Sequence, residues 1–394
     1  MKFDSKTHLL AFKDLVYDLN DDKLRPIEKD DYLSCSVGYN YPVDLIADKE
    51  KNDQMRADIL GFLTCITMSQ EEADYLLNTL ARMLMGGNLY NHMIFLTGCG
   101  GNGKSVLANL MTAALGEGQY AGTMSSHYFS SAKKAGNETD PEMISNKNLR
   151  VLIVQEPENG EKGLNASKCK AASGGDSLRA RLLFSNDVIS FVPQFSMLMC
   201  MNICPDFNAE DGGLQRRIKR IHLPKTFSLE NGPKGKNKSN YSIGVPEIMK
   251  RMMITETVPK PEYGVAFLLL LIETYAKVIR GHERKQFYET PLGVITATAE
   301  LMEDNSHTGA FMDSIVEDPG NKFLLISIKE MYDEIVEEEK IPKKEQLKHS
   351  DFMTMLKSKM GDPVNTKTTA SGKTKKVPDY FTGWNFQAEV DNKP

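Results

Sequence analysis

No long apolar run occurs in this sequence of 394 residues. The longest covers residues 265–272, whereas a helix that spans a membrane needs about 20 apolar residues. The start of the chain, Met1-Lys2-Phe3-Asp4, also lacks the apolar stretch of a signal peptide. These absences predict a soluble, intracellular protein without a membrane partner, and they predict that residues 265–272 form a buried helix.

Paired cysteines are absent as well. The cysteines are spread over the chain without CxxC spacing, at Cys35, Cys65, Cys99, Cys169, Cys200 and Cys204. Cys200 and Cys204 have no second pair nearby, so their spacing does not favour a metal site. Reduced thiols are the better interpretation.

Positive charge is not in excess. The chain has 48 Lys and Arg against 53 Asp and Glu, which gives a net charge of −5. This balance argues against a surface coated in positive charge, but it leaves room for a local basic channel, because nucleic-acid binding depends on where the charge lies. The length exceeds one compact core and predicts two or three domains.

Residues 93–224 alternate short apolar strands with helical stretches. The predicted strands are residues 93–97, 151–154 and 197–201. Such alternation is typical of a parallel α/β domain.

A phosphate-binding loop follows the first of these strands. Its residues fit the pattern GxxxxGK[ST] and are Gly98, Cys99, Gly100, Gly101, Asn102, Gly103, Lys104 and Ser105. Glycines let the backbone amides and the helix N-terminus face phosphate oxygens. Lys104 is suited to neutralising the β- and γ-phosphates and Ser105 to binding Mg²⁺. We therefore expect ATP and Mg²⁺ as cofactors.

Acidic residues follow the strand at 151–154. Glu156 is suited to orienting and activating the attacking water, and Glu158 to completing the Mg²⁺ shell. Many strands end in glutamate, but a position about 50 residues after the phosphate-binding loop favours the catalytic interpretation.

An amide and an arginine pair complete the set. Asn202 follows the strand 197–201, at the edge where ligands bind in open α/β sheets. It would hold the attacking water or sense the γ-phosphate, unless it merely begins a turn before Pro205. Arg216 and Arg217 are suited to stabilising charge on a neighbouring subunit's γ-phosphate as an arginine finger. The alternative is a solvated surface pair.

These four elements, in this order and with the segment KAASGGDSLRAR at residues 170–181, resemble superfamily 3 helicases. The closer resemblance is to the poxvirus-type primase–helicase group of large DNA viruses, phages and plasmids. Residues 155–160 and 164–165 fit the pattern after that group's phosphate-binding loop, and residues 9–19 look like the opening of its helicase unit.

The resemblance implies roles for single residues. It gives Lys104 and Ser105 the Walker A role, Glu156 the Walker B role and Asn202 that of sensor 1. Arg217 becomes the expected finger, with Arg216 in reserve. Residues 170–193 correspond to a segment whose β-hairpin grips single-stranded DNA.

Two departures from the family pattern matter. Pro157 follows Glu156 where many members have a second acid, so the second metal ligand is open. The predicted hairpin tip at residues 185–187 lacks the usual lysine, so the DNA contact is expected on Lys170, Arg179 or Arg181.

The C-terminal stretch predicts two helices and a basic hairpin. Ser327 and Glu330 form a capping-box pair that would open a helix over 328–339, and Ser350 would cap a second over 351–360. The hairpin that follows carries Lys373, Lys375 and Lys376. This pattern is typical of a winged helix whose lysines contact phosphates, and a small closing domain with solvated lysines is the alternative.

Together these features predict an α/β fold: a P-loop, AAA+-like ATPase core with an N-terminal helical collar and a C-terminal winged-helix domain. The predicted divisions are a β-rich opening segment at 1–55, the collar at 56–92, the ATPase domain at 93–227, a loop and helical lid at 228–320 and the winged-helix-like domain at 321–394. The resemblance implies a hexamer that moves 3′ to 5′ on single-stranded DNA and unwinds forked DNA. Its place would be the host cytoplasm or a viral replication site, with a primase domain or polymerase as a further partner.

Two other functions compete with a helicase. One is an ATP-switched DNA-binding initiator or defence ATPase that assembles without unwinding. The other is a P-loop kinase of small molecules, which the arginine pair and the long C-terminal half disfavour.

Overall fold

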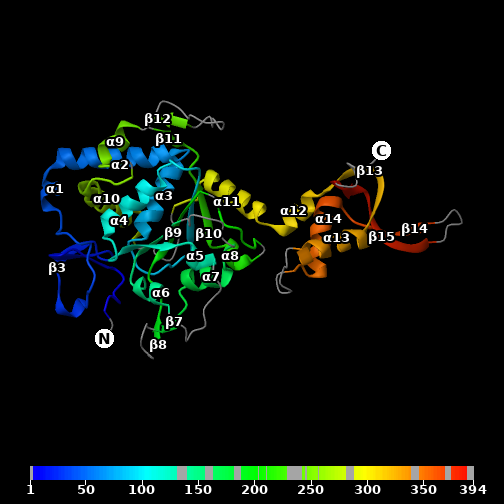
Figure 1. Ribbon diagram of the computed structural model, residues 1–394, viewed down its shortest axis with the longest axis horizontal. Helices are drawn as coiled ribbons and strands as arrows, with labels where there is room; N and C mark the ends of the chain where they lie inside the picture. Colours follow the sequence, from blue (N-terminus) through cyan, green and yellow to red (C-terminus); the bar gives the residue numbers. More distant parts are fainter. Residues whose placement is uncertain are drawn as a thin grey trace. The chain divides into compact units, whose positions relative to one another are not determined.

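The computed structural model describes residues 3–130, 140–155, 163–181, 188–202, 204–209, 211–228, 242–244, 246–255, 257–280, 288–338, 346–368 and 374–387. The chain divides into two compact units, Met1–Phe207 with Gly213–Ala299, and Asn208–Gly212 with Glu300–Pro394 (Figure 1). Each unit has a hydrophobic core of its own.

Five parallel strands form the central sheet of the first unit, in the order β10-β4-β9-β6-β5. Their bounds are β4 Met93–Thr97, β5 Ala121–Ser125, β6 Val151–Gln155, β9 Ser196–Met201 and β10 Ile218–His222. The three central strands are buried almost throughout. Continuous apolar strands of this kind suit a parallel sheet that is covered on both faces. The predicted α/β fold class is therefore confirmed.

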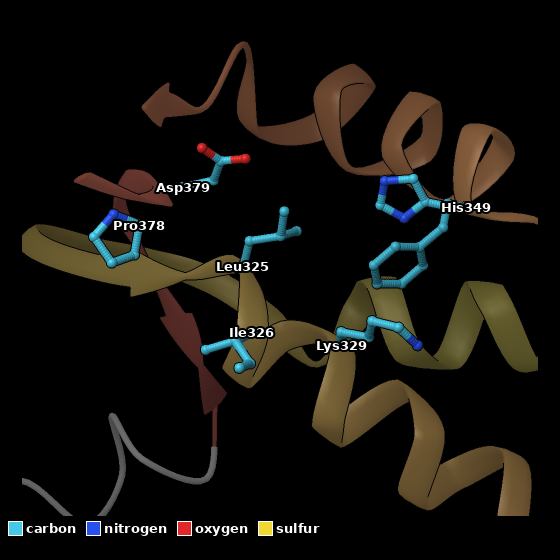
Figure 2. A pocket seen from close by; sticks show the side chains of 7 residues that line it. Leu325, Ile326, Lys329, His349, Pro378 and Asp379 are labelled. Carbon is cyan, nitrogen blue, oxygen red and sulfur yellow. The ribbon is translucent and has the colours of Figure 1, made fainter. Parts of the chain in front are cut away.

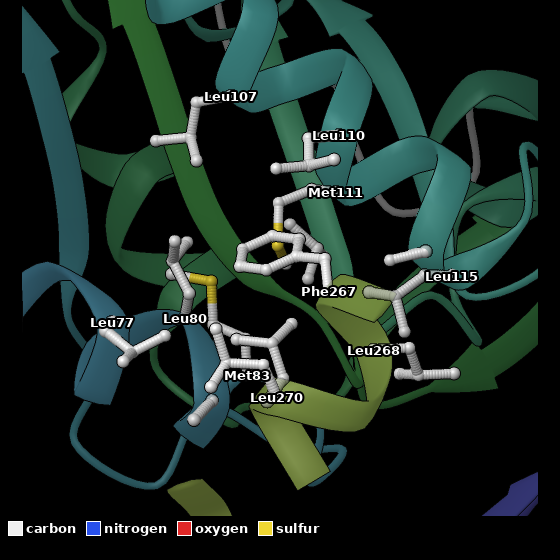
Figure 3. Packing of buried hydrophobic residues seen from close by; sticks show 14 of the residues in the cluster. Leu77, Leu80, Met83, Leu107, Leu110, Met111, Leu115, Phe267, Leu268 and Leu270 are labelled. Carbon is white, nitrogen blue, oxygen red and sulfur yellow. The ribbon is translucent and has the colours of Figure 1, made fainter. Parts of the chain in front are cut away.

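Apolar helices pack around the helix that carries the phosphate-binding lysine. This helix, α4 (Lys104–Leu115), packs along α10 (Pro261–Thr274), which also contacts α2 (Lys49–Ile66) and α3 (Gln70–Arg82). Figure 3 shows Phe267 of α10 lying beside Met111 of α4. Helix α10 contains the run 265–272 and is largely buried, so the prediction of a buried helix there is confirmed.

A three-stranded antiparallel sheet precedes these helices, with β1 Leu9–Ala11, β2 Leu15–Asp18 and β3 Lys23–Pro26. Arg150, whose side chain is buried, joins this sheet to the core. Its Nη2 donates to the Leu9 carbonyl at 2.9 Å, its Nη1 donates to the Thr7 carbonyl, and its guanidinium lies 5.2 Å from the centre of the Tyr120 ring. A buried cation keeps such a position only when it is hydrogen-bonded.

The other described elements before α11 are short. They are η1 Lys29–Asp31, α1 Val43–Ala47, α5 His127–Ser130, α6 Pro141–Ser145, α7 Ala166–Ser173, β7 Leu178–Arg181, β8 Val188–Phe191, α8 Gly212–Gln215, β11 Thr226–Ser228, β12 Ser242–Gly244, α9 Glu247–Met252 and the π-helical turn η2 Tyr275–Ile279. Helix α11 (Leu292–Asp304) contains the division between the two units.

The second unit places helices against a three-stranded antiparallel sheet of order β13-β15-β14. In chain order its elements are α12 His307–Asp313, β13 Ile315–Leu324, α13 Leu325–Glu338, α14 His349–Met360, β14 Val364–Thr368 and β15 Thr374–Phe386. Aromatic residues dominate its core, among them Phe311, Phe323 and Phe352. A cleft of about 290 Å³ lies where α13 and α14 begin, with Leu325 and Ile326 in its wall (Figure 2).

Five strands were missed by the sequence analysis: β5, β10, β11, β12 and β13. The capping-box prediction was also wrong, because α13 begins at Leu325, so that Ser327 and Glu330 lie inside the helix. The second helix begins at His349 after Lys348, which makes no side-chain cap, so Ser350 does not cap it. Within the described stretches, the helices are too short or too polar to cross a bilayer.

Candidate nucleotide-binding site

The loop between β4 and α4 has a backbone shape that only glycine adopts readily. Gly98 has φ +147°, and a Cβ there would lie 2.2 Å from the Leu223 carbonyl oxygen. Gly103, which precedes α4, has φ +90°, and a Cβ there would lie 2.7 Å from Cγ2 of Ile66. Both positions lie in the left-handed region that disfavours residues with side chains. The glycines thus let the loop curl tightly at the N-terminus of α4, where phosphates bind.

Lys104 is 7% exposed and directs its ammonium group back into this loop. Its Nζ donates to the carbonyl oxygen of Gly98 at 2.6 Å, to Oδ1 of Asn102 at 3.0 Å and to Oδ1 of Asn202 at 3.0 Å. All three acceptors are neutral oxygens. Phosphate oxygens would form stronger, charge-assisted hydrogen bonds, so this ammonium group is placed to exchange loop acceptors for a phosphate.

Asn202 reaches Lys104 because of the register of the parallel sheet. Thr97 at the end of β4 pairs with Met201 at the end of β9, so the residues that follow the two strands lie at the same edge. Ligands bind at the carboxyl ends of strands in sheets of this kind. The structure therefore brings the predicted Walker A lysine and the predicted sensor amide together.

The metal ligands are placed only in part. Ser105 is exposed in the first turn of α4, where its hydroxyl can reach a metal ion beside the phosphates. Glu156 and Glu158 lie outside the described residues. Gln155, just before Glu156, pairs with Cys200 near the end of β9, so β6 ends at the same edge of the sheet as the phosphate-binding loop. This donor set fits Mg²⁺, which favours oxygen ligands.

The chain after β10 also lines the phosphate-binding loop. Nδ2 of Asn102 donates to the Leu223 carbonyl at 3.1 Å, and the Phe227 amide donates to the Gly101 carbonyl at 2.8 Å. Asn102 is 2% exposed, so its side chain supports the loop from within. These contacts were missed by sequence reasoning, since backbone acceptors leave no mark in the side-chain pattern.

The arginine pair lies at the amino ends of the strands, opposite the strand ends that carry the phosphate-binding loop. The Met93 amide, at the start of β4, donates to the Arg217 carbonyl at 2.7 Å, and β10 begins at the next residue. Five strand residues, roughly 16 Å, thus separate this turn from the strand end that carries the loop. Arg216 is exposed, whereas Arg217 is 6% exposed. The pair does not approach the phosphate-binding loop of its own chain.

A β-hairpin presents the predicted DNA-contacting arginines. Strands β7 and β8 are antiparallel, with Arg179 opposite Ser190 and Arg181 opposite Val188. Side chains alternate along a strand, so Arg179 and Arg181 share one face. Lys170 lies in the last turn of α7, just before this hairpin.

Three predicted basic residues and the hairpin tip are not described. Residues 185–187 and Lys373 lie outside the described residues, as do the side chains of Lys375 and Lys376 in β15.

The buried cysteines are poor metal ligands as they stand. Burial raises the pKa of the Cys200 thiol to about 12 and that of Cys169 to about 12. A metal binds the thiolate, which is scarce at neutral pH when the pKa is so high. In the described part of the chain, no group of three or more His, Cys, Asp or Glu residues is arranged to hold a metal ion.

The sheet and this loop define a P-loop protein of the α/β class. A family model described as "D5 N terminal like" matches residues 1–68. The chain is 27% identical over 274 residues to L207/L206 of Acanthamoeba polyphaga mimivirus, named as a helicase, with 70% of this chain and 27% of that protein covered. It is 27% identical over 172 residues to 022R of Frog virus 3, also named as a helicase, with 43% and 17% covered.

Among solved structures, the apo structure of the NrS-1 C-terminal region overlaps with 84% of this chain and 76% of that one, at 10% identity and a TM-score of 0.44. The match to the mimivirus relative covers about a quarter of that protein's length, so this chain corresponds to only part of it. The sequence matches confirm the predicted resemblance to superfamily 3 helicases of the primase–helicase group of large DNA viruses.

Replacing Lys104 by alanine tests the site. We expect ATP turnover to fall by a factor on the order of 10² or more, because a preorganised cationic donor to the phosphates is lost. The variant should still fold with a cooperative melting transition, because the ammonium group supports no apolar core. Lys13→Ala is the matched control, because Lys13 is exposed and lies far from Lys104 in the sequence. A turnover rate of Lys104→Ala close to the wild-type rate would contradict the assignment.

Proposed function

We propose that this chain is the helicase part of a viral-type primase–helicase, an ATP-dependent replicative DNA helicase that works as a hexameric ring. The contact between Lys104 and Asn202 at the carboxyl edge of the sheet carries the proposal. It unites two residues that are 98 positions apart in the sequence, each with a predicted role toward the γ-phosphate. Similarity to viral proteins named as helicases supports DNA as the partner.

In the proposed mechanism the nucleotide lies at the amino end of α4. Lys104 would bind the β- and γ-phosphate oxygens, and Asn202, released from Lys104, would hold the attacking water. Glu156 would take the proton from that water. Mg²⁺, held by Ser105 and an acid after β6, would neutralise charge that develops on the phosphates.

The position of the arginine pair supports a shared site. Arg216 and Arg217 precede β10 at the edge away from their own phosphate-binding loop, so a finger from this turn would act on the nucleotide of a neighbouring subunit. A site of this kind requires an oligomer, and a closed ring with one interface type satisfies it for every subunit. We take six subunits and 3′ to 5′ movement from the family resemblance.

The hairpin and the second unit would supply DNA contacts. Arg179 and Arg181 on one face of β7 form a pair suited to the phosphates of single-stranded DNA. The element order α12, β13, α13, α14, β14, β15 supports a winged helix, with β14, β15 and residues 369–373 between them as the wing. Lys373, Lys375 and Lys376 would contact phosphates there.

The assembly state tests the shared site. Glu156→Gln keeps the shape of the side chain but cannot take a proton, so it should bind ATP and hydrolyse it very slowly. With ATP, Mg²⁺ and single-stranded DNA, native mass measurement should give six times the 44.1 kDa of one chain. Lys104→Ala under the same conditions is the control that binds phosphate poorly. A monomer in both samples would contradict the ring.

The wing lysines give a second test. Replacing Lys373, Lys375 and Lys376 together by alanine should weaken DNA binding. It should also flatten the dependence of log K on log salt by about 0.7 to 0.9 for each phosphate that these lysines no longer neutralise. Circular dichroism and the melting temperature check the fold of the variant. An unchanged affinity and salt slope would favour a closing domain with solvated lysines.

A further inference from the structure

Two adjacent arginines before β10 lie in opposite environments. Arg216 is exposed, and Arg217 is 6% exposed. Nη1 of Arg217 donates to the Gly213 carbonyl at 2.6 Å, and its amide donates to the Leu214 carbonyl at 2.8 Å. A buried guanidinium is costly to move because its hydrogen bonds would be broken inside the protein. Arg217 is therefore held in its own subunit, and Arg216 is displayed.

The other side of the Arg217 guanidinium faces the base of the hairpin. A Cβ on Gly174 would lie 3.3 Å from Nη2 of Arg217 and 3.3 Å from Oδ2 of Asp176. Gly174 ends α7, and the chain enters β7 four residues later. The absence of a side chain at Gly174 leaves the space that the guanidinium approaches. The Arg217 side chain thus packs between its own turn, residues 213–217 (the arginine turn), and residues 174–176, which lead into the hairpin.

We propose that Arg216 is the residue that crosses to the nucleotide of a neighbouring subunit, and that Arg217 is a positioning residue. Arg217 fixes the turn that carries Arg216 against residues 170–176 at the base of the hairpin. This inference rests on the proposed function. An exposed guanidinium reaches a neighbour's phosphate without losing internal hydrogen bonds, whereas Arg217 would first have to leave its own. The buried contact also joins the hairpin that carries Arg179 to the turn that carries Arg216.

Mixed assemblies test the two roles. Arg216→Ala and Arg217→Ala are each mixed with Lys104→Ala, and ATP turnover is measured with and without single-stranded DNA. Arg216→Ala alone should bind ATP and lose turnover by about 10³ to 10⁵. In the mixture it should regain activity, because some interfaces then pair an intact lysine with an intact arginine. Arg216→Lys should stay slow, since an ammonium lacks the planar fork.

Arg217 should behave differently in the same assay. Arg217→Ala should lose turnover because the turn that carries Arg216 is displaced, and turnover should return in the mixture because the Lys104→Ala subunits supply an intact turn. The stimulation by single-stranded DNA should not return, because the hairpin base of each Arg217→Ala subunit stays displaced. Arg217→Lys keeps a donor for the Gly213 carbonyl and should recover part of the stimulation, which also covers the case in which Arg217→Ala does not fold. Arg280→Ala removes a half-buried arginine that pairs with Asp22 at 2.7 Å, and is the control with near wild-type rates.

The possible failures are distinguishable. Rescue of Arg217→Ala together with a wild-type rate for Arg216→Ala would reverse the two roles and overturn the inference, while the shared site would stand. Restoration of the stimulation by single-stranded DNA in the Arg217→Ala mixture would also overturn it. No rescue of either variant, in mixtures shown to co-assemble, would overturn the shared site and with it the proposed function.

Discussion

Burial of the Lys104 ammonium group against neutral oxygens is the constraint on which the site depends. A buried cation must be hydrogen-bonded, and its acceptors come from the loop itself and from the end of β9. Asn102, one of these acceptors, also donates to the Leu223 carbonyl just after β10. Residues at the ends of β4, β9 and β10 are thus linked through Lys104 and Asn102. In the proposed mechanism, a phosphate that draws Lys104 away would free Asn202 and Asn102 together.

The parallel sheet gives this arrangement two functional edges. Its carboxyl edge carries the phosphate-binding loop and Asn202, and its amino edge carries the turn with Arg216 and Arg217. Strand β10 runs from the arginine turn to Leu223, which contacts the phosphate-binding loop. In a ring, β10 would have the nucleotide of the neighbouring subunit at its amino end and the nucleotide of its own subunit at its carboxyl end. Such a connection couples two sites only if the strand has two arrangements that both sites bias.

Local motifs were predictable from the sequence, and features that depend on distant segments were not. The phosphate-binding loop was found because its glycines, Lys104 and Ser105 are adjacent. The missed strands β5 and β10 are the edge strands of the sheet, and their sequences, AGTMS and IKRIH, are less apolar than those of the central strands. β13 was missed because Pro319-Gly320 inside it resembles a turn, and its register shifts there. The burial of Arg217 could not be predicted, because it depends on packing around residues such as Gly174, far away in the sequence.

In the proposed function, ATP turnover at this site separates DNA strands. A forked duplex with a single-stranded 3′ tail and a labelled strand tests it most directly, with wild-type protein, ATP and Mg²⁺. We expect the wild type to release the labelled strand, and we expect no release by Lys104→Ala or without ATP. ATP turnover that is stimulated by DNA but leaves the fork intact would contradict a helicase function, and would favour an ATP-switched DNA-binding protein.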